Sequence, residues 1–167
     1  MVVAVPAGIC PCDPKLVSLP TRSPAPRDTG WLCTSAAKAR PATTDAMPFM
    51  YTTNLSEVRA LAEHEARVSG MPEDRIIDFV IAVGEVAANT VRHAQSPGSM
   101  EIWRAGGELV CEIRDAGMIT DPRVGRRPPP AEANGGHGLW LVHQICDRVD
   151  LHSDETGTVI RLHMNLH

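Results

Sequence analysis

Apolar residues recur at the spacing of an amphipathic α-helix in two stretches of the middle of the chain. The first runs from residue 55 to about residue 68, with Asn54 or Ser56 placed to cap it. The second runs from about residue 73 to 94. Its apolar positions form one core-facing stripe: Ile76, Val80, Val83, Ala87 and Val91. The pattern therefore predicts two consecutive helices that each bury one face.

Alternating apolar and polar residues elsewhere predict strands. The segment "FMYTT" is a short strand candidate, and residues 100–117 indicate a hairpin that turns at Gly106-Gly107. A third helix is expected from about Gly138 to Asp147, followed by a second hairpin that turns at Thr156-Gly157. Hairpins beside three helices predict an α+β fold, a two-layer α/β sandwich whose mostly antiparallel sheet has the three helices on one face.

Residues 1–46 show neither the 3.6-residue period of a helix nor the two-residue period of a strand. Together with Pro48 they hold eight of the 14 prolines, so we expect a disordered or linker-like tail before one domain at 47–167. The remnant of an upstream domain is the alternative. The native start is open between Met1, Met47 and Met50.

Composition narrows the classes of function. The formal net charge of −4 gives no basic footprint for nucleic acid. No apolar run approaches the roughly 18 residues of a membrane span, and the first residues lack the basic start of a signal peptide. The five cysteines fit no zinc spacing, which favours a reducing, cytoplasmic setting.

A polar stripe interrupts the second helix. Glu85, Asn89 and His93 follow one another at four-residue spacing in "GEVAANTVRHA" and share one face. Such a face is usually solvated. However, Asn is disfavoured inside helices, its amide oxygen suits Mg²⁺, and a nearby carboxylate can polarise a hydroxyl.

Two further segments have both an ordinary and a functional interpretation. The segment Asp115-Ala116-Gly117 either forms a plain turn or places a carboxylate where it can accept a hydrogen bond from an exocyclic amine such as that of adenine. The glycines of "GGHGLWLV" (135–142) make either a flexible helix entry or an amide cradle for phosphates. The segment is not a Walker P-loop, because no Gly-Lys-Ser/Thr follows.

The ordered combination of Glu-x-x-x-Asn, Asp-x-Gly and Gly-x-Gly-Leu resembles the GHKL ATPase superfamily over residues 49–166. The resemblance implies ATP and Mg²⁺ as cofactors. It assigns Glu85 as general base, Asn89 as the Mg²⁺ ligand and Asp115 as the acceptor of the adenine amine. The remaining cofactor-binding positions that it implies are Gly117 beside the base, Gly136, Gly138 and Leu139 at the phosphates, and Thr158 near adenine.

One position departs from the family pattern. The superfamily often has Asp-x-Gly-x-Gly, but "DAGMI" places Ile119 at the second glycine, which bears on the hinge of the lid that follows. Of the lid arginines 123, 126 and 127, we expect at least two to be solvated. Residues 128–130, all proline, should stiffen the lid.

Within the superfamily, the short chain and the third motif resemble stand-alone bacterial anti-sigma-factor kinases. That resemblance implies a sigma factor and an anti-sigma-factor antagonist as partners, with phosphorylation of a Ser or Thr on the antagonist. It makes a homodimer plausible, with the first helix as a candidate surface. The alternatives are an ATP-dependent binding module without catalysis and the ATP-binding fragment of a larger sensor kinase.

Overall fold

The computed structural model describes residues 47–94, 96–121, 123–129 and 136–167. The predicted tail at 1–46 lies outside the described residues, and so do Pro130 and Gly135 of the predicted lid and glycine-rich segment. Apart from residues 95, 122 and 130–135, the described ranges include the whole of the predicted domain.

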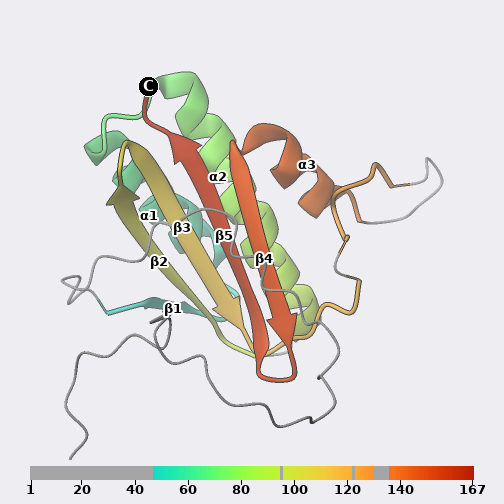
Figure 1. Ribbon diagram of the computed structural model, residues 1–167. Coiled ribbons are helices and arrows are strands. Elements are labelled where there is room, and N and C mark those ends of the chain that lie inside the picture. Colours follow the sequence, from blue (N-terminus) through green and yellow to red (C-terminus); the bar gives the residue numbers. More distant parts are fainter. Residues whose placement is uncertain (1–46, 95, 122, 130–135) are drawn as a thin grey trace, which may run out of the picture. The chain divides into compact units, whose positions relative to one another are not determined.

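Five strands form one sheet in the order β1-β2-β3-β5-β4, with every neighbouring pair antiparallel (Figure 1). Both predicted hairpins are confirmed. The turn of the second lies one residue earlier than expected, because Asp154 Oδ1 accepts from Thr156 N at 2.8 Å and Gly157 already pairs with Asp154. The strands are β1 (Phe49–Tyr51), β2 (Gly98–Ala105), β3 (Glu108–Asp115), β4 (Arg148–Asp154) and β5 (Gly157–Asn165).

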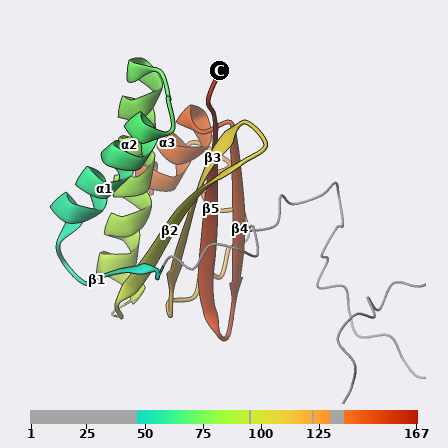
Figure 2. The ribbon, with the colours of Figure 1, turned by 90° about the vertical axis from the view of Figure 1, so that its left-hand side faces the viewer.

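Three α-helices cover one face of this sheet, as the sequence predicted (Figure 2). They are α1 (Leu55–Val68), α2 (Glu73–Asn89) and α3 (His137–Ile145). Asn54 caps α1, since its side chain accepts from Glu57 N. Helix α3 ends two residues before the predicted Asp147, because Asp147 N instead donates to His163 O of β5 at 3.1 Å.

The last turn of the predicted second helix has a different geometry. Residues Thr90–Ala94 form a π-helical turn, η1, directly after α2. Turns of this kind are rare and occur often at functional sites, because the extra residue per turn redirects the side chains. Here Thr90 is buried while Asn89 is only half-buried.

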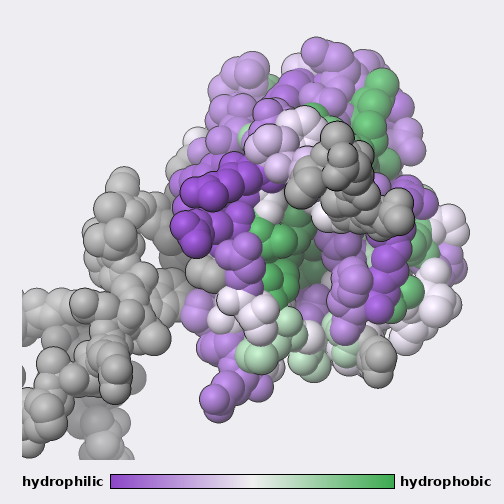
Figure 3. All heavy atoms as spheres, turned by 90° about the vertical axis from the view of Figure 1, so that its right-hand side faces the viewer, coloured by the Kyte–Doolittle hydropathy of each residue, from purple (hydrophilic) through white to green (hydrophobic). Residues whose placement is uncertain are grey.

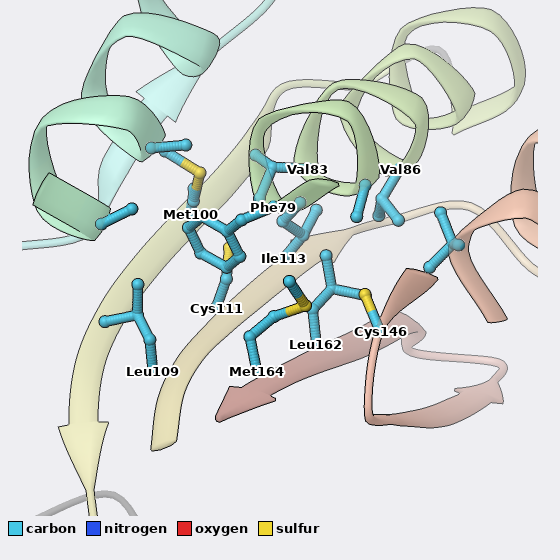
Figure 4. Packing of buried hydrophobic residues seen from close by; sticks show 14 of the residues in the cluster. Phe79, Val83, Val86, Met100, Leu109, Cys111, Ile113, Cys146, Leu162 and Met164 are labelled. Atoms are coloured by element: carbon cyan, nitrogen blue, oxygen red, sulfur yellow. The ribbon is translucent and has the colours of Figure 1, made fainter. Parts of the chain in front are cut away.

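The core lies between α2 and the centre of the sheet (Figure 4). Phe79, Val83 and Val86 of α2 pack against the side chains that β3 and β5 turn toward the helices. All five residues of the predicted stripe on α2 lie in this core or pack against it, with Val80 and Val91 half-buried at its edge. The fully buried strand residues of this core include Leu109, Cys111, Ile113, Leu162 and Met164.

Arg75 of α2 ties the C-terminal end of α3 to the rest of the domain. Its guanidinium donates to Ile145 O at 3.1 Å and to Asp147 Oδ2 at 2.6 Å. The same Asp147 oxygen accepts from Asn165 N of β5 at 2.8 Å. The orientation of α3, and with it the position of its first turn, is therefore set by side-chain contacts as well as by the core.

Among the described helices, none combines the length and the apolar character that crossing a bilayer requires.

Candidate functional site

Glu85 on α2 and Gly138 in the first turn of α3 lie against each other. A Cβ atom placed on Gly138 would be 2.5 Å from Glu85 Oε2, so only glycine permits this approach. Asn89 lies one helical turn after Glu85, and both side chains are half-buried rather than fully solvated. Across the described residues, no hydrogen bond or ion pair joins either side chain to another side chain. An acid and an amide therefore stand beside a helix start, and each keeps its hydrogen-bonding capacity.

Asp115 closes β3 with both carboxylate oxygens engaged. Oδ1 accepts from Gly117 N at 2.8 Å, and Oδ2 accepts from Thr90 Oγ1 at 2.7 Å. A carboxylate oxygen has room for more than one donor, so Asp115 can still accept a further bond. Its side chain is half-buried.

Thr158, opposite Asp115 on β5, belongs to a second chain of hydrogen bonds. Its hydroxyl donates to Gly117 O at 2.8 Å, so the 2.7 Å contact with Ser153 Oγ must be a donation from Ser153. The hydroxyl of Ser153 in turn accepts from Ile119 N at 2.8 Å. The backbone after Asp115 is therefore held in place from Gly117 to Ile119, and the bulky residue at position 119 is accommodated, half-buried, against the core.

Two glycines permit close backbone approaches at this end of the sheet. A Cβ on Gly117 would lie 3.0 Å from Ala94 Cα at the end of η1. Gly157, at φ +137°, passes the carbonyl oxygen of Asp115 so closely that a Cβ would overlap it. Both contacts bring the ends of η1, β3 and β5 together around Asp115.

The predicted ligand-binding residues at the start of α3 can contact a ligand through their backbone but not through side chains. Leu139 is only 7% exposed and its side chain packs in the core, so any contact it makes with a ligand is through its backbone. Gly136 has the left-handed φ of +84° that a glycine adopts easily, and it precedes the helix. Gly125 of the predicted lid, at φ +76°, lies against Leu139, where a Cβ would be 2.8 Å from the Leu139 carbonyl oxygen.

The lid arginines 123, 126 and 127 are exposed, in agreement with the expected solvation of at least two of them. Arg126 nevertheless lies close enough to α3 to act on His143. The pKa of His143 is lowered first by burial and second by the positive charge of Arg126.

The sequence did not single out three residues that complete the strand end of this site: Thr90, Ser153 and Tyr51. Tyr51 of β1 is 4% exposed, and its hydroxyl has no hydrogen-bond partner among the described residues. Burial raises the pKa of Tyr51 to about 12; the neighbouring Thr90 hydroxyl acts against this shift, and the negative charge of Asp115 adds to it. Neither the hydrophobic periodicity nor the motif spacing marks these residues, because Thr90 and Ser153 reach Asp115 and Thr158 from other elements and Tyr51 is buried on a third.

The structure thus gathers the predicted residues at two ends of one region around the C-terminal half of α2. Glu85, Asn89 and Gly138 lie at the α2–α3 end, and Asp115, Gly117 and Thr158 lie at the strand end. Thr90, the residue after Asn89, links the two ends through Asp115. Figure 3 shows that the side of the domain carrying α3 is hollowed, with hydrophobic surface in the hollow and hydrophilic residues around it.

Comparisons with known proteins find similarity to a described family and to a protein kinase. Residues 51–164 match the family described as histidine kinase-like ATPase domain. The serine-protein kinase RsbW of Halalkalibacterium halodurans is 29% identical over 119 residues, which cover 63% of this chain and 72% of that protein.

Solved structures with a similar arrangement are more distant in sequence. The RsbU and RsbW domains of a Mycobacterium tuberculosis protein align with a TM-score of 0.49 at 19% identity, covering 72% of this chain and only 33% of that longer one. The catalytic domain of the histidine kinase ThkA aligns with a TM-score of 0.47 at 15% identity, covering 72% of this chain and 97% of that one.

Proposed function

This chain belongs to the family of histidine kinase-like ATPase domains, and we propose that it is an ATP-dependent protein serine/threonine kinase of the anti-sigma-factor type. In this proposal it binds a sigma factor and phosphorylates a Ser or Thr on an anti-sigma-factor antagonist. The likeness to the serine-protein kinase RsbW supports the choice of branch. The observation that carries the enzymatic part is the position of the Glu85 carboxylate directly beside the first turn of α3.

The strand end supplies the adenine-binding part of the proposed site. Asp115 accepts from the exocyclic amine of adenine, Gly117 lies beside the ring, and Thr158 orders the backbone around them. This fits the chemistry, since Asp115 keeps acceptor capacity beyond its two internal bonds. The half-buried carboxylate forms a stronger hydrogen bond with an amine donor than an exposed carboxylate would, because less solvent competes for it.

The helix end supplies the phosphate-binding part. Gly136, Gly138 and the backbone of Leu139 present amides at the start of α3, where the helix dipole favours negative charge. The amide oxygen of Asn89 is a suitable ligand for Mg²⁺, which would neutralise phosphate charge when bound with ATP. The absence of any side-chain partner for Asn89 among the described residues leaves that oxygen available.

The proposed reaction is a transfer of the γ-phosphoryl group to the partner's hydroxyl. Glu85 takes the proton of that hydroxyl as its oxygen bonds to the γ-phosphorus, the bond between this phosphorus and the β,γ-bridging oxygen breaks, and ADP leaves. The amides at the start of α3 hold the phosphate oxygens during transfer. Because Gly138 has no side chain, the Glu85 carboxylate can stand next to those amides.

The competing function is an ATP-dependent binding module that performs no transfer, either alone or as part of a larger sensor kinase. Glu85 distinguishes the two, since a module that only binds nucleotide has no use for a base at that position. Self-association through α1 stays a prediction.

The test compares Glu85→Gln with the wild-type chain in the presence of Mg-ATP and a candidate antagonist. We expect the variant to lose phosphotransfer by at least about 100-fold while ADP affinity stays within about twofold, because removal of a general base typically costs 10²–10⁴ in rate. The matched control is Glu155→Gln in the exposed β4–β5 turn. This variant should change neither the rate of phosphotransfer nor the affinity for ADP. Unaltered ADP binding without phosphotransfer in the wild type would favour the binding module.

A further inference from the structure

The Asp115 carboxylate is held from inside the protein by two donors. Gly117 N reaches Oδ1 at 2.8 Å, and the hydroxyl of Thr90 reaches Oδ2 at 2.7 Å. Both distances are those of well-formed hydrogen bonds. The first bond comes from the neighbouring backbone, whereas the second comes from a side chain 25 residues away, in η1.

The direction of the Thr90 hydroxyl is set by its surroundings. Thr90 is 2% exposed, and its other acceptor within the described structure, Val86 O, lies at the longer distance of 3.4 Å. A hydroxyl has one proton, so the charged and closer Asp115 oxygen receives it. The buried hydroxyl of Tyr51 lies next to Thr90 and forms no hydrogen bond with Asp115 in the described structure, so Thr90 supplies the side-chain donor to Asp115 Oδ2.

We propose that Thr90 is a positioning residue that makes this site select purines with a 6-amino group over purines with a 6-oxo group. The inference rests on the proposed function, in which Asp115 receives the adenine amine. With donors on both oxygens, the carboxylate is fixed in rotation and offers only lone pairs to the site. The 6-amino group of adenine donates to those lone pairs, whereas the 6-oxo group of guanine or hypoxanthine presents an acceptor and is repelled.

The sharpest pair of variants is Thr90→Val and Thr90→Ser. Valine keeps the shape of the buried side chain and removes the donor, while serine restores the donor. Calorimetry would measure the dissociation constants of ADP and of inosine diphosphate, which has a 6-oxo group in place of the 6-amino group and therefore also carries a proton on N1. We expect the wild type and Thr90→Ser to prefer ADP, and Thr90→Val to lose about tenfold of that preference, the value of one hydrogen bond to a charged group.

A double-mutant cycle shows whether Thr90 acts through Asp115. In an Asp115→Asn background, Thr90→Val should leave the ratio of the two dissociation constants unchanged, because the group that it positions is already altered. Thermal unfolding of each variant separates a folding defect from a loss of selectivity, and the serine variant preserves the test if valine impairs folding.

The outcomes separate the two proposals. A wild-type chain that binds neither nucleotide overturns the proposed function and this inference together. A chain that binds ADP, but whose preference over inosine diphosphate is the same in Thr90→Val, overturns the inference alone. Independent, additive effects of Thr90→Val and Asp115→Asn also overturn it, since they place the two residues in separate roles.

Discussion

The two ends of the candidate site are built in opposite ways. At the strand end, Asp115, Gly117 and Thr158 are joined by hydrogen bonds from Thr90 and Ser153 and by close backbone contacts. At the α2–α3 end, Glu85 and Asn89 make no side-chain hydrogen bond within the described structure. The Glu85 carboxylate there lies close to Gly138 only because Gly138 has no side chain.

This difference indicates a division of labour. Groups already held by the protein lose little further freedom when a ligand binds, so the strand end is suited to recognise a rigid base. Groups without partners remain able to respond to phosphates, a cation and a partner's hydroxyl, so the α2–α3 end is suited to chemistry. The contrast predicts that changes at the strand end alter stability and affinity, while changes at the helix end alter transfer.

The largest effect is expected from Gly157→Ala, which breaks the strand end. The new Cβ overlaps the Asp115 carbonyl and the residue keeps φ +137°. We therefore expect the free energy of unfolding to fall by about 3 kcal/mol. Urea denaturation measures this. Gly107→Ala is the control, since it has φ +89° but its nearest neighbour is the His167 ring at 3.3 Å, and it should cost about 1 kcal/mol. Equal losses would contradict a special close approach at Gly157.

Asp115→Asn comes next and tests recognition directly. The amide has nearly the same shape but removes the charge that Thr90, Gly117 and the proposed amine all donate to. We expect ADP affinity to fall about 30-fold, within the range for hydrogen bonds to a charged group. Calorimetry with ADP measures it. An Asp115→Asn variant that binds ADP as tightly as the wild type would remove the strand end from nucleotide recognition.

Gly138→Ala tests the helix end. Its Cβ would displace the Glu85 carboxylate, but Oε2 is the tip of a flexible side chain, so stability should change by less than about 0.5 kcal/mol. We expect phosphotransfer to fall about tenfold with ADP affinity little changed, because a misplaced base costs rate rather than binding. In a Glu85→Gln background the same substitution should cause no further loss. An equal loss in both backgrounds would show that Gly138 acts independently of Glu85.

The smallest effect is expected from Tyr51→Phe, beside Asp115. The pKa of Tyr51 is about 12 in the folded chain, above its ordinary value of 10, so the folded state keeps a proton that the unfolded state releases between pH 10 and 12. Stability contributed below pH 10 is therefore lost as pH rises, by about 1.4 kcal/mol at pH 11. The variant should lack this loss.

The measurement for Tyr51 is the free energy of unfolding at pH 8 and pH 11 in both chains. Burial also raises the pKa of the Cys111 and Cys146 thiols, but they are present in wild type and variant alike, so their contribution cancels in the difference. The same pH dependence in both chains would mean that Tyr51 is not buried as a neutral group.

Much of the fold followed from the chain's own pattern. Helical spacing predicted α1 and α2, and alternation around Gly106-Gly107 predicted the first hairpin, because these patterns reflect which face of one element meets the core. The predictions of local structure failed where residues distant in the sequence determine the conformation. The π-helical turn at Thr90–Ala94 and the early end of α3 depend on contacts with β3 and β5 that no local period contains.

For the site, the sequence by itself predicted which residues would carry chemistry, since Glu85, Asn89, Asp115 and the glycines stand in recognisable motifs. Only the tertiary structure decided how they are held. The bond from Thr90 to Asp115 and the approach of Gly138 to Glu85 join residues 25 and 53 positions apart. Motif spacing records what each segment needs locally, but packing of helix on sheet and pairing of strands set the distances between segments.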